Sequence, residues 1–336
     1  MPTDLFVSAA SWPEDSIARA VPPSCYRGVD AAPRPRRDGD SMIVEFPEWS
    51  PRHPAHRLVP ALSALGRGVS PFRFEVSVFA AGLWSPWVAG ATVGRGRFPA
   101  VATATDSVAA QIDEFVASPP AERVRVVLRA GAGPSDALAP PWFVSLSAWS
   151  PATPEETVPG RSARLVVPAL SQMEEEAAIR SRICSPTCVA MVLAYYGAHV
   201  SVADLAREIF QPDLDIYGVW PAAVRAAGRH GIAGYLLRFP DWSAAEWCLT
   251  KGMPIIASVR YGAGELTGAA ASSTPGHLLV LTGHADDAVF VNDPAAPTAS
   301  EVSRRYRLDQ LRRIWLERAG VGYVLFRPPP DEAAAG

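Results

Sequence analysis

The segment 184–197 is CSPTCVAMVLAYYG, and it sets the expectations for the C-terminal half of the chain. A cysteine followed by Ser, Pro and Thr and then by a periodic apolar run predicts the first turn of a buried helix. Pro186 suits a first turn because the N–H that proline lacks would have no intrahelical acceptor there. Free N–H groups and the positive end of the helix dipole favour the thiolate form of a cysteine. Cys184 is therefore the candidate nucleophile.

The composition predicts a globular protein with room for two domains. The chain has 336 residues, of which 49% are hydrophobic and 19% are charged. A net charge of −3 provides no basic field, so we expect no nucleic-acid partner. No apolar run approaches the roughly 18 residues of a membrane helix, so we expect no membrane-spanning segment. The composition does not indicate an oligomeric state.

Four cysteines in a chain of this length do not indicate a disulfide framework. Residues 1–20 lack the basic start and apolar core of a secretory signal, which favours a cytoplasmic protein; secretion stays open if the true start lies further upstream. Cys184 and Cys188 are four residues apart, which is not the C-x-x-C spacing of zinc sites. We therefore expect neither a metal nor an organic cofactor.

The N-terminal part of the sequence favours β structure. Residues 1–40 are rich in Pro, Ala and Arg and are expected to form a loosely ordered lead-in. From 41 to 150 the pattern predicts a mainly antiparallel β-sandwich. Within it, apolar and polar residues alternate over 72–78, which predicts one buried and one solvent-facing side. The Pro- and Thr-rich stretch 151–164 is the expected linker.

Residues 165–327 change to a mixed α and β pattern, and the Pro/Ala-rich tail 328–336 is expected to fray. The predicted fold class is therefore α+β. Shorter elements expected inside this region are helices starting at Ser201 and at Ser243 (ending at Gly252), and buried strands over 165–170 and 253–259.

The segment 276–294, GHLLVLTGHADDAVFVNDP, provides a candidate base and an acid to orient it. Two apolar runs flank a Gly/His/Asp turn, which predicts a hairpin. If the turn centres on Ala285, His277 lies opposite Asp293 with the Cβ atoms about 5 Å apart. The hairpin would then place an imidazole beside a carboxylate.

These residues together make up the parts of a cysteine-dependent acyl transfer site. His277 would accept the proton of the Cys184 thiol and return it to the leaving amine, while Asp293 would fix the tautomer of the ring. The oxyanion would be held by the backbone N–H of Cys184 and by one upstream side chain, for which Gln172 is the best candidate. Taken singly, a buried cysteine or histidine is more often a core residue; the combination favours catalysis.

The remaining candidates are weaker. Tyr217 and Trp220 are candidates to line a substrate groove. Cys188 lies one turn into the predicted helix and is expected in the core. His284 falls in the predicted turn, where we expect it to be solvated.

The chain resembles the peptidase C39-like family, which are papain-like cysteine peptidases. The resemblance covers roughly 165–327 and keeps the order Gln, Cys, His, Asp. The matching positions are Gln172, Cys184-Ser185-Pro186-Thr187, Gly218-Val219-Trp220-Pro221, Gly276-His277-Leu278-Leu279-Val280, Val291-Asn292-Asp293-Pro294, Arg305-Tyr306-Arg307 and Trp315.

This resemblance implies a papain-like fold, in which a helix carrying Cys184 packs on an antiparallel sheet carrying His277 and Asp293, and thiol-dependent hydrolysis of a peptide or protein substrate. The β-rich part before it resembles an accessory domain of some bacterial members. Two alternatives remain open. One is transfer of the acyl group to an amine other than water. The other is a catalytically silent peptide-binding module, which Ser185, where members often have Gly, keeps open.

Overall fold

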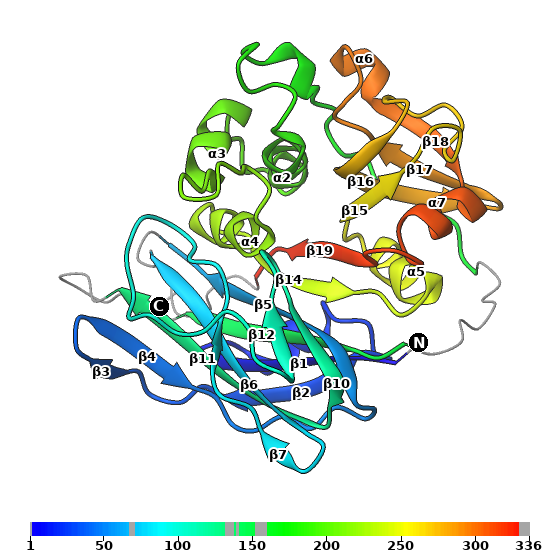
Figure 1. The fold of residues 1–336 in the computed structure, drawn as a ribbon. Helices are drawn as coiled ribbons and strands as arrows, with labels where there is room; N and C mark the ends of the chain where they lie inside the picture. Colours follow the sequence, from blue (N-terminus) through cyan, green and yellow to red (C-terminus); the bar gives the residue numbers. More distant parts are fainter. Residues whose placement is uncertain (1, 67–70, 132–137, 139–140, 152–159, 329–336) are drawn as a thin grey trace, which may run out of the picture.

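A computed structural model of the chain describes residues 2–66, 71–131, 138, 141–151 and 160–328. Two regions follow one another along the chain, an N-terminal region of β-sheets and a C-terminal region in which helices pack on a third sheet (Figure 1). The α+β fold class predicted from the sequence is confirmed.

Two sheets make up the N-terminal region. The first contains, in spatial order, β2 (Tyr26–Ala31), β1 (Thr3–Ala10), β12 (Trp142–Trp149), β5 (Ala55–Ala64), β10 (Phe115–Ala121) and β9 (Val108–Ala110). The second contains β3 (Arg36–Asp38), β4 (Ser41–Glu45), β11 (Arg123–Gly131), β6 (Phe72–Ala80) and β7 (Leu83–Trp84), with β8 (Val88–Ala89) also paired to β6. Apart from the parallel pair β1–β2, the strand pairs are antiparallel, and the two sheets share one apolar core.

The expectation of a loosely ordered lead-in over 1–40 is wrong. β1 lies between β2 and β12 and is almost entirely buried, and the short helix α1 (Glu14–Ala18) follows it. The Pro- and Arg-rich composition hid an eight-residue strand whose pairing partner β12 lies more than 130 residues away. Local composition could not reveal a contact of that range.

The solvent-facing side predicted for 72–78 is also buried. Arg73 and Glu75 on β6 form an ion pair of 2.7 Å, and Arg129 on β11 bonds the same carboxylate at 2.7 Å. The Arg73 guanidinium also donates to the carbonyl of Pro99 in the segment that covers this face. These charged side chains can be buried because each of them is paired. Polar and apolar residues of β6 therefore still point to opposite sides of the strand, but neither side is exposed to water.

The C-terminal sheet is antiparallel and contains, in order, β14 (Ala233–Arg238), β19 (Val321–Phe326), β15 (Ile255–Tyr261), β16 (Thr274–Ala285), β17 (Ala288–Asn292) and β18 (Ser303–Arg307), with β13 (Ala163–Arg164) paired to β16. The helices are α2 (Cys184–Tyr195), α3 (Val202–Ile209), α4 (Trp220–Arg229), α5 (Trp242–Thr250), α6 (Ala299–Val302) and α7 (Leu308–Ile314), preceded by a 3₁₀ turn, η1 (Gln172–Glu174).

Both faces of this sheet are covered by helices. Ile256 and Val280 belong to the core that includes α2, whereas Ala257 and Leu279, their neighbours in sequence, belong to the core that includes α5 and α7. Because successive side chains of a strand point to opposite faces, the apolar runs of β15 and β16 fill both cores at once. The buried strand predicted over 253–259 is thereby accounted for by β15.

Two local expectations need correction. Residues 165–170 form no strand, and Val166 in this stretch is 91% exposed. The helix expected to start at Ser243 is instead capped by Asp241, whose side chain accepts the N–H of Ala244. Glu246 is therefore free to accept hydrogen bonds from the N–H groups of Gly160 and Arg161.

The helix predicted from Ser201 is confirmed as α3, with the Ser201 hydroxyl accepting a hydrogen bond from the N–H of Asp204. Residues 152–159 of the predicted linker and 329–336 of the predicted tail lie outside the described residues.

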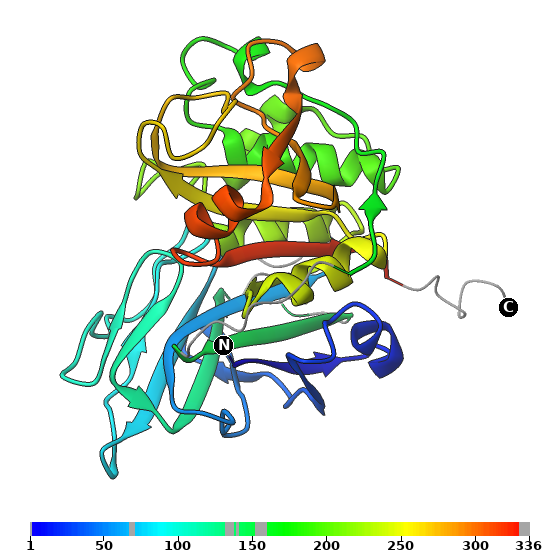
Figure 2. The ribbon, with the colours of Figure 1, turned by 90° about the vertical axis from the view of Figure 1, so that its right-hand side faces the viewer.

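The two regions pack against one another along β14 and α4 (Figures 1 and 2). The N–H groups of Gly234 and Arg238 on β14 donate to the hydroxyls of Ser63 on β5 and Ser147 on β12, at 3.1 and 3.0 Å. Gly228 on α4 lies so close to β5 that a Cβ atom there would stand 2.3 Å from the Ala64 carbonyl oxygen. Backbone-to-side-chain bonds and close approach therefore fix one region against the other.

Candidate active site

Cys184 is the first residue of α2, as predicted from its sequence. Ile183 precedes the helix without a side-chain cap, and the residues from Ser185 to Leu193 are buried while Cys184 is partly accessible. The N–H of Ser185, in the first turn, has no intrahelical acceptor. Backbone N–H groups of Ser185 and Leu278 both lower the pKa of the Cys184 thiol.

His277 on β16 lies beside Asp293, which directly follows β17. Nε2 of His277 and Oδ1 of Asp293 are 2.8 Å apart, and both side chains are almost fully buried. The predicted pairing of imidazole and carboxylate is therefore present. The register by which it was predicted is wrong, because β16 and β17 pair Leu281 with Val291, two residues away from the expected partner.

The pairing survived this error for a geometric reason. The turn lies at 286–287 rather than at Ala285, and one irregularity between Leu281 and Gly283 shifts the register back by one residue. A slip of two residues keeps every side chain on its face, so His277 and Asp293 become diagonal neighbours instead of direct partners. Gly283 is required at the irregularity because a Cβ atom there would lie 2.2 Å from the Ala163 carbonyl oxygen.

Asp293 is held by three donors. Oδ1 accepts from His277 and from the backbone N–H of Ala295 at 3.1 Å, and Oδ2 accepts from the hydroxyl of Tyr306 on β18 at 2.7 Å. Burial would raise the pKa of Asp293, but His277, Tyr306 and the Ala295 N–H lower it overall. The carboxylate therefore stays charged and fixed in orientation.

Cys184 and His277 line the same cleft, and each shifts the pKa of the other. Because Nε2 bonds Asp293, the ring nitrogen left for the sulfur is Nδ1. Burial would raise the pKa of the Cys184 thiol, but the hydrogen bond and charge of His277 outweigh it and lower that pKa. Burial would lower the pKa of His277, but the bonds to Asp293 and Cys184 raise it to about 10. The arrangement thus favours a thiolate–imidazolium pair.

The other three cysteines are buried, and their thiol pKa values are shifted in the opposite direction from that of Cys184. Burial raises the pKa of Cys25 to about 12 and raises those of Cys188 and Cys248 well above the usual range. The Cys188 sulfur contacts the carbonyl oxygen of Leu278 at 3.3 Å, as expected of a core residue. Of the four thiols, Cys184 alone has a lowered pKa.

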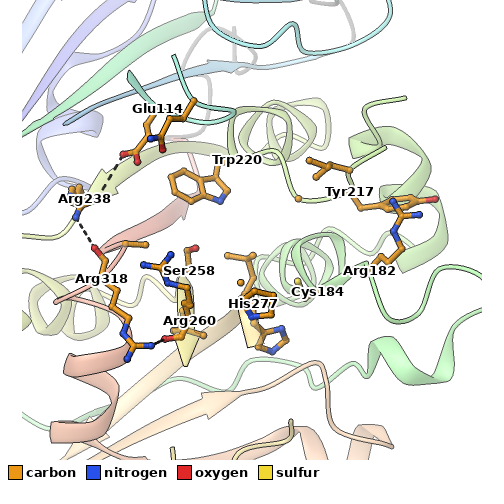
Figure 3. Close-up of a pocket in the computed structure, with 18 of the residues that line it drawn as sticks. Glu114, Arg182, Cys184, Tyr217, Trp220, Arg238, Ser258, Arg260, His277 and Arg318 are labelled. Carbon is orange, nitrogen blue, oxygen red and sulfur yellow. Dashed lines mark hydrogen bonds and ion pairs between the residues drawn. The ribbon is translucent and has the colours of Figure 1, made fainter. Parts of the chain in front are cut away.

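The sulfur faces a cleft of about 640 Å³ between the two regions (Figure 3). Cys184 and His277 line it together with Tyr217 and Trp220, the two residues predicted to line a substrate groove. The wall facing them comes partly from the N-terminal region, through Arg57, Gln111 and Glu114. In Figure 3 Trp220 lies between Glu114 and the Cys184–His277 pair, so the two regions enclose the cleft together.

Gln172 does not line this cleft. Its side chain is buried, Nε2 donates to the Arg180 carbonyl oxygen at 2.7 Å, and Oε1 has no partner in the described part of the chain. Its role as oxyanion donor stays a prediction. His284 is not solvated as expected, because it lies on β16, is 1% exposed and packs edge-on against Trp242.

Two contacts of the site were not predicted from the sequence. Tyr306 reaches Asp293 only because β18 pairs with β17, and the sequence separation hides this contact. Glu114 lines the cleft only because the two regions pack against one another.

Among the described residues no group of three or more His, Cys, Asp or Glu side chains could hold a metal ion, and no helix is long and apolar enough to cross a membrane.

Comparison with known proteins finds a family match for the C-terminal half of the chain. Residues 164–323 match the model of the Peptidase_C39 like family. This C39-like stretch makes up slightly less than half of the chain. The C39-like stretch contains Cys184, His277 and Asp293, and its bounds lie close to the 165–327 expected from the sequence.

Three solved structures resemble the C39-like stretch. A protein described as a C39-like peptidase from Bacillus anthracis is 18% identical, with a TM-score of 0.40, over 50% of this chain and 98% of its own. A double-glycine-motif protease from an AMS/PCAT transporter, in complex with its leader peptide, is 19% identical with a TM-score of 0.35, over 50% and 99%. The peptidase domain of Streptococcus ComA is 17% identical with a TM-score of 0.34, over 48% and 98%. No curated protein matches the chain.

Proposed function

We propose that this protein is a cysteine peptidase or amidase whose nucleophile is Cys184. The observation that carries the proposal is that Cys184 lines one cleft together with His277, which Asp293 holds at 2.8 Å and which lowers the pKa of the thiol. A nucleophile, a base and an orienting acid in this order of contact are the parts that thiol hydrolysis requires. The family of residues 164–323 supports the same reaction class.

In the proposed reaction the Cys184 thiolate attacks the carbonyl carbon of the substrate amide and forms a carbon–sulfur bond. The negative charge that develops on the carbonyl oxygen is stabilised by the backbone N–H of Cys184 at the start of α2. His277 gives its Nδ1 proton to the leaving nitrogen as the carbon–nitrogen bond breaks. Water then attacks the thioester, with His277 accepting its proton, and releases the acid and the thiolate.

Asp293 has a positioning role in this scheme. Its carboxylate holds the ring so that Nδ1 faces the sulfur, and its charge stabilises the imidazolium. Tyr306 and the Ala295 N–H fix the carboxylate in turn. Substrate would lie along Tyr217 and Trp220, which line the cleft beside the sulfur.

The test is pre-steady-state kinetics with an excess of an activated ester or amide substrate. Wild-type protein is expected to release one equivalent of leaving group in a burst, with an acyl adduct on Cys184 visible by mass spectrometry. Cys184→Ala should remove both signals, and Cys188→Ala, its neighbour one turn along α2, should keep them. An intact fold without a burst in wild-type protein would refute the proposal and favour the binding-module alternative.

A further inference from the structure

The charges that line the cleft are distributed unequally on the two sides of the sulfur. Five arginines and two acidic side chains line it. On the side of Tyr217, Arg182 pairs with Asp215 at 2.9 Å, so the charges there balance. On the other side lie Arg238, Arg260 and Arg318, which Figure 3 shows gathered across His277 from Tyr217.

Two carboxylates face this arginine side, and each already has a partner. Glu114 bonds Arg57 at 2.5 Å, and Arg238 approaches it only to 4.0 Å. Glu265 bonds Arg318 at 2.5 Å. After these pairs are counted, Arg238 and Arg260 contribute a surplus of positive charge on this side of the cleft.

Arg260 is the accessible member of this surplus. It lies near the end of β15, its side chain is exposed, and in the described part of the chain no carboxylate pairs with its guanidinium. Its backbone carbonyl accepts a hydrogen bond from Arg318, which ties the two residues together. Arg260 therefore lines the cleft as an exposed cation with no carboxylate partner in the described part of the chain.

Arg238 forms the buried base of the arginine side. Its guanidinium donates to the Arg318 carbonyl oxygen at 2.8 Å and stacks over the ring of Trp149 at 4.1 Å. Its Nε is buried without a hydrogen-bond partner among the described residues. A buried donor without a partner is costly, and a ligand oxygen that reached it would satisfy it.

We propose that the cleft selects substrates with a carboxylate placed on the side of Arg238, Arg260 and Arg318, so that the enzyme acts on acidic peptides. This inference rests on the proposed function and adds the substrate class to it. The carboxylate is either an acidic side chain or the terminal carboxylate of the peptide. Guanidinium groups bind both through the same paired N–H···O geometry.

The first experiment needs no known substrate. Cys184 is alkylated with iodoacetate, which carries a carboxylate, and with neutral iodoacetamide; in both reactions the sulfur bonds the CH₂ carbon and iodide leaves. The ratio of the two rates reports the potential at the sulfur. We expect Arg260→Gln to lower this ratio by about twofold to fivefold, the range for an accessible charge pair, and 0.5 M salt to lower it in wild type.

The matched control is Arg305→Gln, which removes one exposed arginine from β18 outside the cleft lining and should leave the ratio unchanged. Arg260 is chosen over Arg238 because an exposed side chain can be replaced without loss of the fold. A ratio that Arg260→Gln does not lower would overturn the inference. If instead neither reagent reacts faster with Cys184 than with a small thiol, it is the proposed function that fails.

The second experiment separates the two sources of the carboxylate. Peptide libraries differing only by Glu or Gln, each with a free or an amidated C-terminus, are digested and the cleavage rates compared by mass spectrometry. A preference for Glu supports an acidic side chain, and a preference for the free terminus supports the terminal carboxylate. Either preference should shrink in Arg260→Gln. Equal cleavage of all four libraries by wild-type enzyme would refute the inference.

Discussion

The hydroxyl of Tyr306 donates a 2.7 Å hydrogen bond to Oδ2 of Asp293, the oxygen that His277 does not use. Tyr306 is itself buried, and burial together with the Asp293 charge raises the pKa of its hydroxyl far above the usual range. It therefore remains a donor throughout the working pH range. The two oxygens are held by side chains on β16 and β18, the strands that flank β17 in the sheet.

Tyr306→Phe is expected to lower kcat/KM by about tenfold to a hundredfold, since a hydrogen bond to a charged group contributes about 1.5–3 kcal/mol. With one donor lost, the Asp293 carboxylate becomes more basic and its pKa should rise, and because it stays charged at alkaline pH it should stabilise the His277 imidazolium more strongly. The alkaline limb of the pH–rate profile, set by the His277 pKa of about 10, should therefore move to higher pH. Tyr195→Phe, which removes a hydroxyl bonded to the neutral Gly252 carbonyl, is the control. An unmoved alkaline limb would contradict this role of Tyr306.

Labelling of the native thiols should be confined to one residue. At pH 7–8 iodoacetamide is expected to modify Cys184, whose thiol pKa is lowered, and to spare Cys25, Cys188 and Cys248, whose thiol pKa values are raised by burial. Peptide mapping by mass spectrometry gives the site and the stoichiometry. Cys184→Ser should remove the signal, and unfolding in urea should release the other three thiols. Native labelling at Cys25 would count against the structure.

Asp113 makes the stability of the protein depend on pH. Its side chain accepts the N–H of Trp220 at 2.7 Å where α4 begins, and burial, only partly opposed by this bond, raises its pKa to about 7. The folded state therefore binds a proton more tightly than the unfolded state, for which the pKa is near 3.9. Between these two values the free energy of unfolding should decrease as pH rises.

Asp113→Asn keeps an oxygen acceptor for Trp220 and removes the ionisation. Urea unfolding at pH 4.5 and pH 8 should show a smaller loss of stability with pH in this variant than in wild type. Asp106→Asn, at a neighbouring carboxylate whose side chain is outside this contact, should behave as wild type. The same pH dependence in Asp113→Asn and wild type would refute the assignment.

Gly228 should not tolerate a side chain. A Cβ atom there would stand 2.3 Å from the Ala64 carbonyl oxygen, so Gly228→Ala must push α4 away from β5. We expect a loss of about 3 kcal/mol, the upper part of the range for overpacking. Gly231→Ala is the contrast, because its Cβ would meet open space and only its positive φ would cost about 1 kcal/mol. Denaturant melts measure both, and equal losses would argue against the close contact.

The sequence predicted the site better than its surroundings. Cys184 at the start of a helix follows from local rules, since Pro186 and the apolar run act over one or two turns. His277 beside Asp293 was expected from hairpin symmetry, and the two-residue error in register left both side chains on one face. Side chains alternate between the two faces of a strand, so a register error of two residues leaves them on the predicted face. An error of one residue would have moved them to the opposite face.

What the sequence could not predict depends on contacts between distant segments. β1 is ordered by β12, and Arg73 is buried because the segment around Pro99 covers it. The arginine side of the cleft joins β14, β15 and the residues after α7, and no spacing in the sequence brings these together. Composition and periodicity describe neighbours along the chain, whereas these features are set by neighbours in space.

The hydrogen bonds that β14 donates to the hydroxyls of Ser63 and Ser147 have a practical consequence for expressing part of this chain on its own. A recombinant fragment that begins where the family match begins would contain the thiol and its partners. It would also leave the apolar surfaces of β14 and α4 without cover, a condition that promotes aggregation. The unit to express is the whole chain, because the first 150 residues solubilise the rest as well as forming one wall of its cleft.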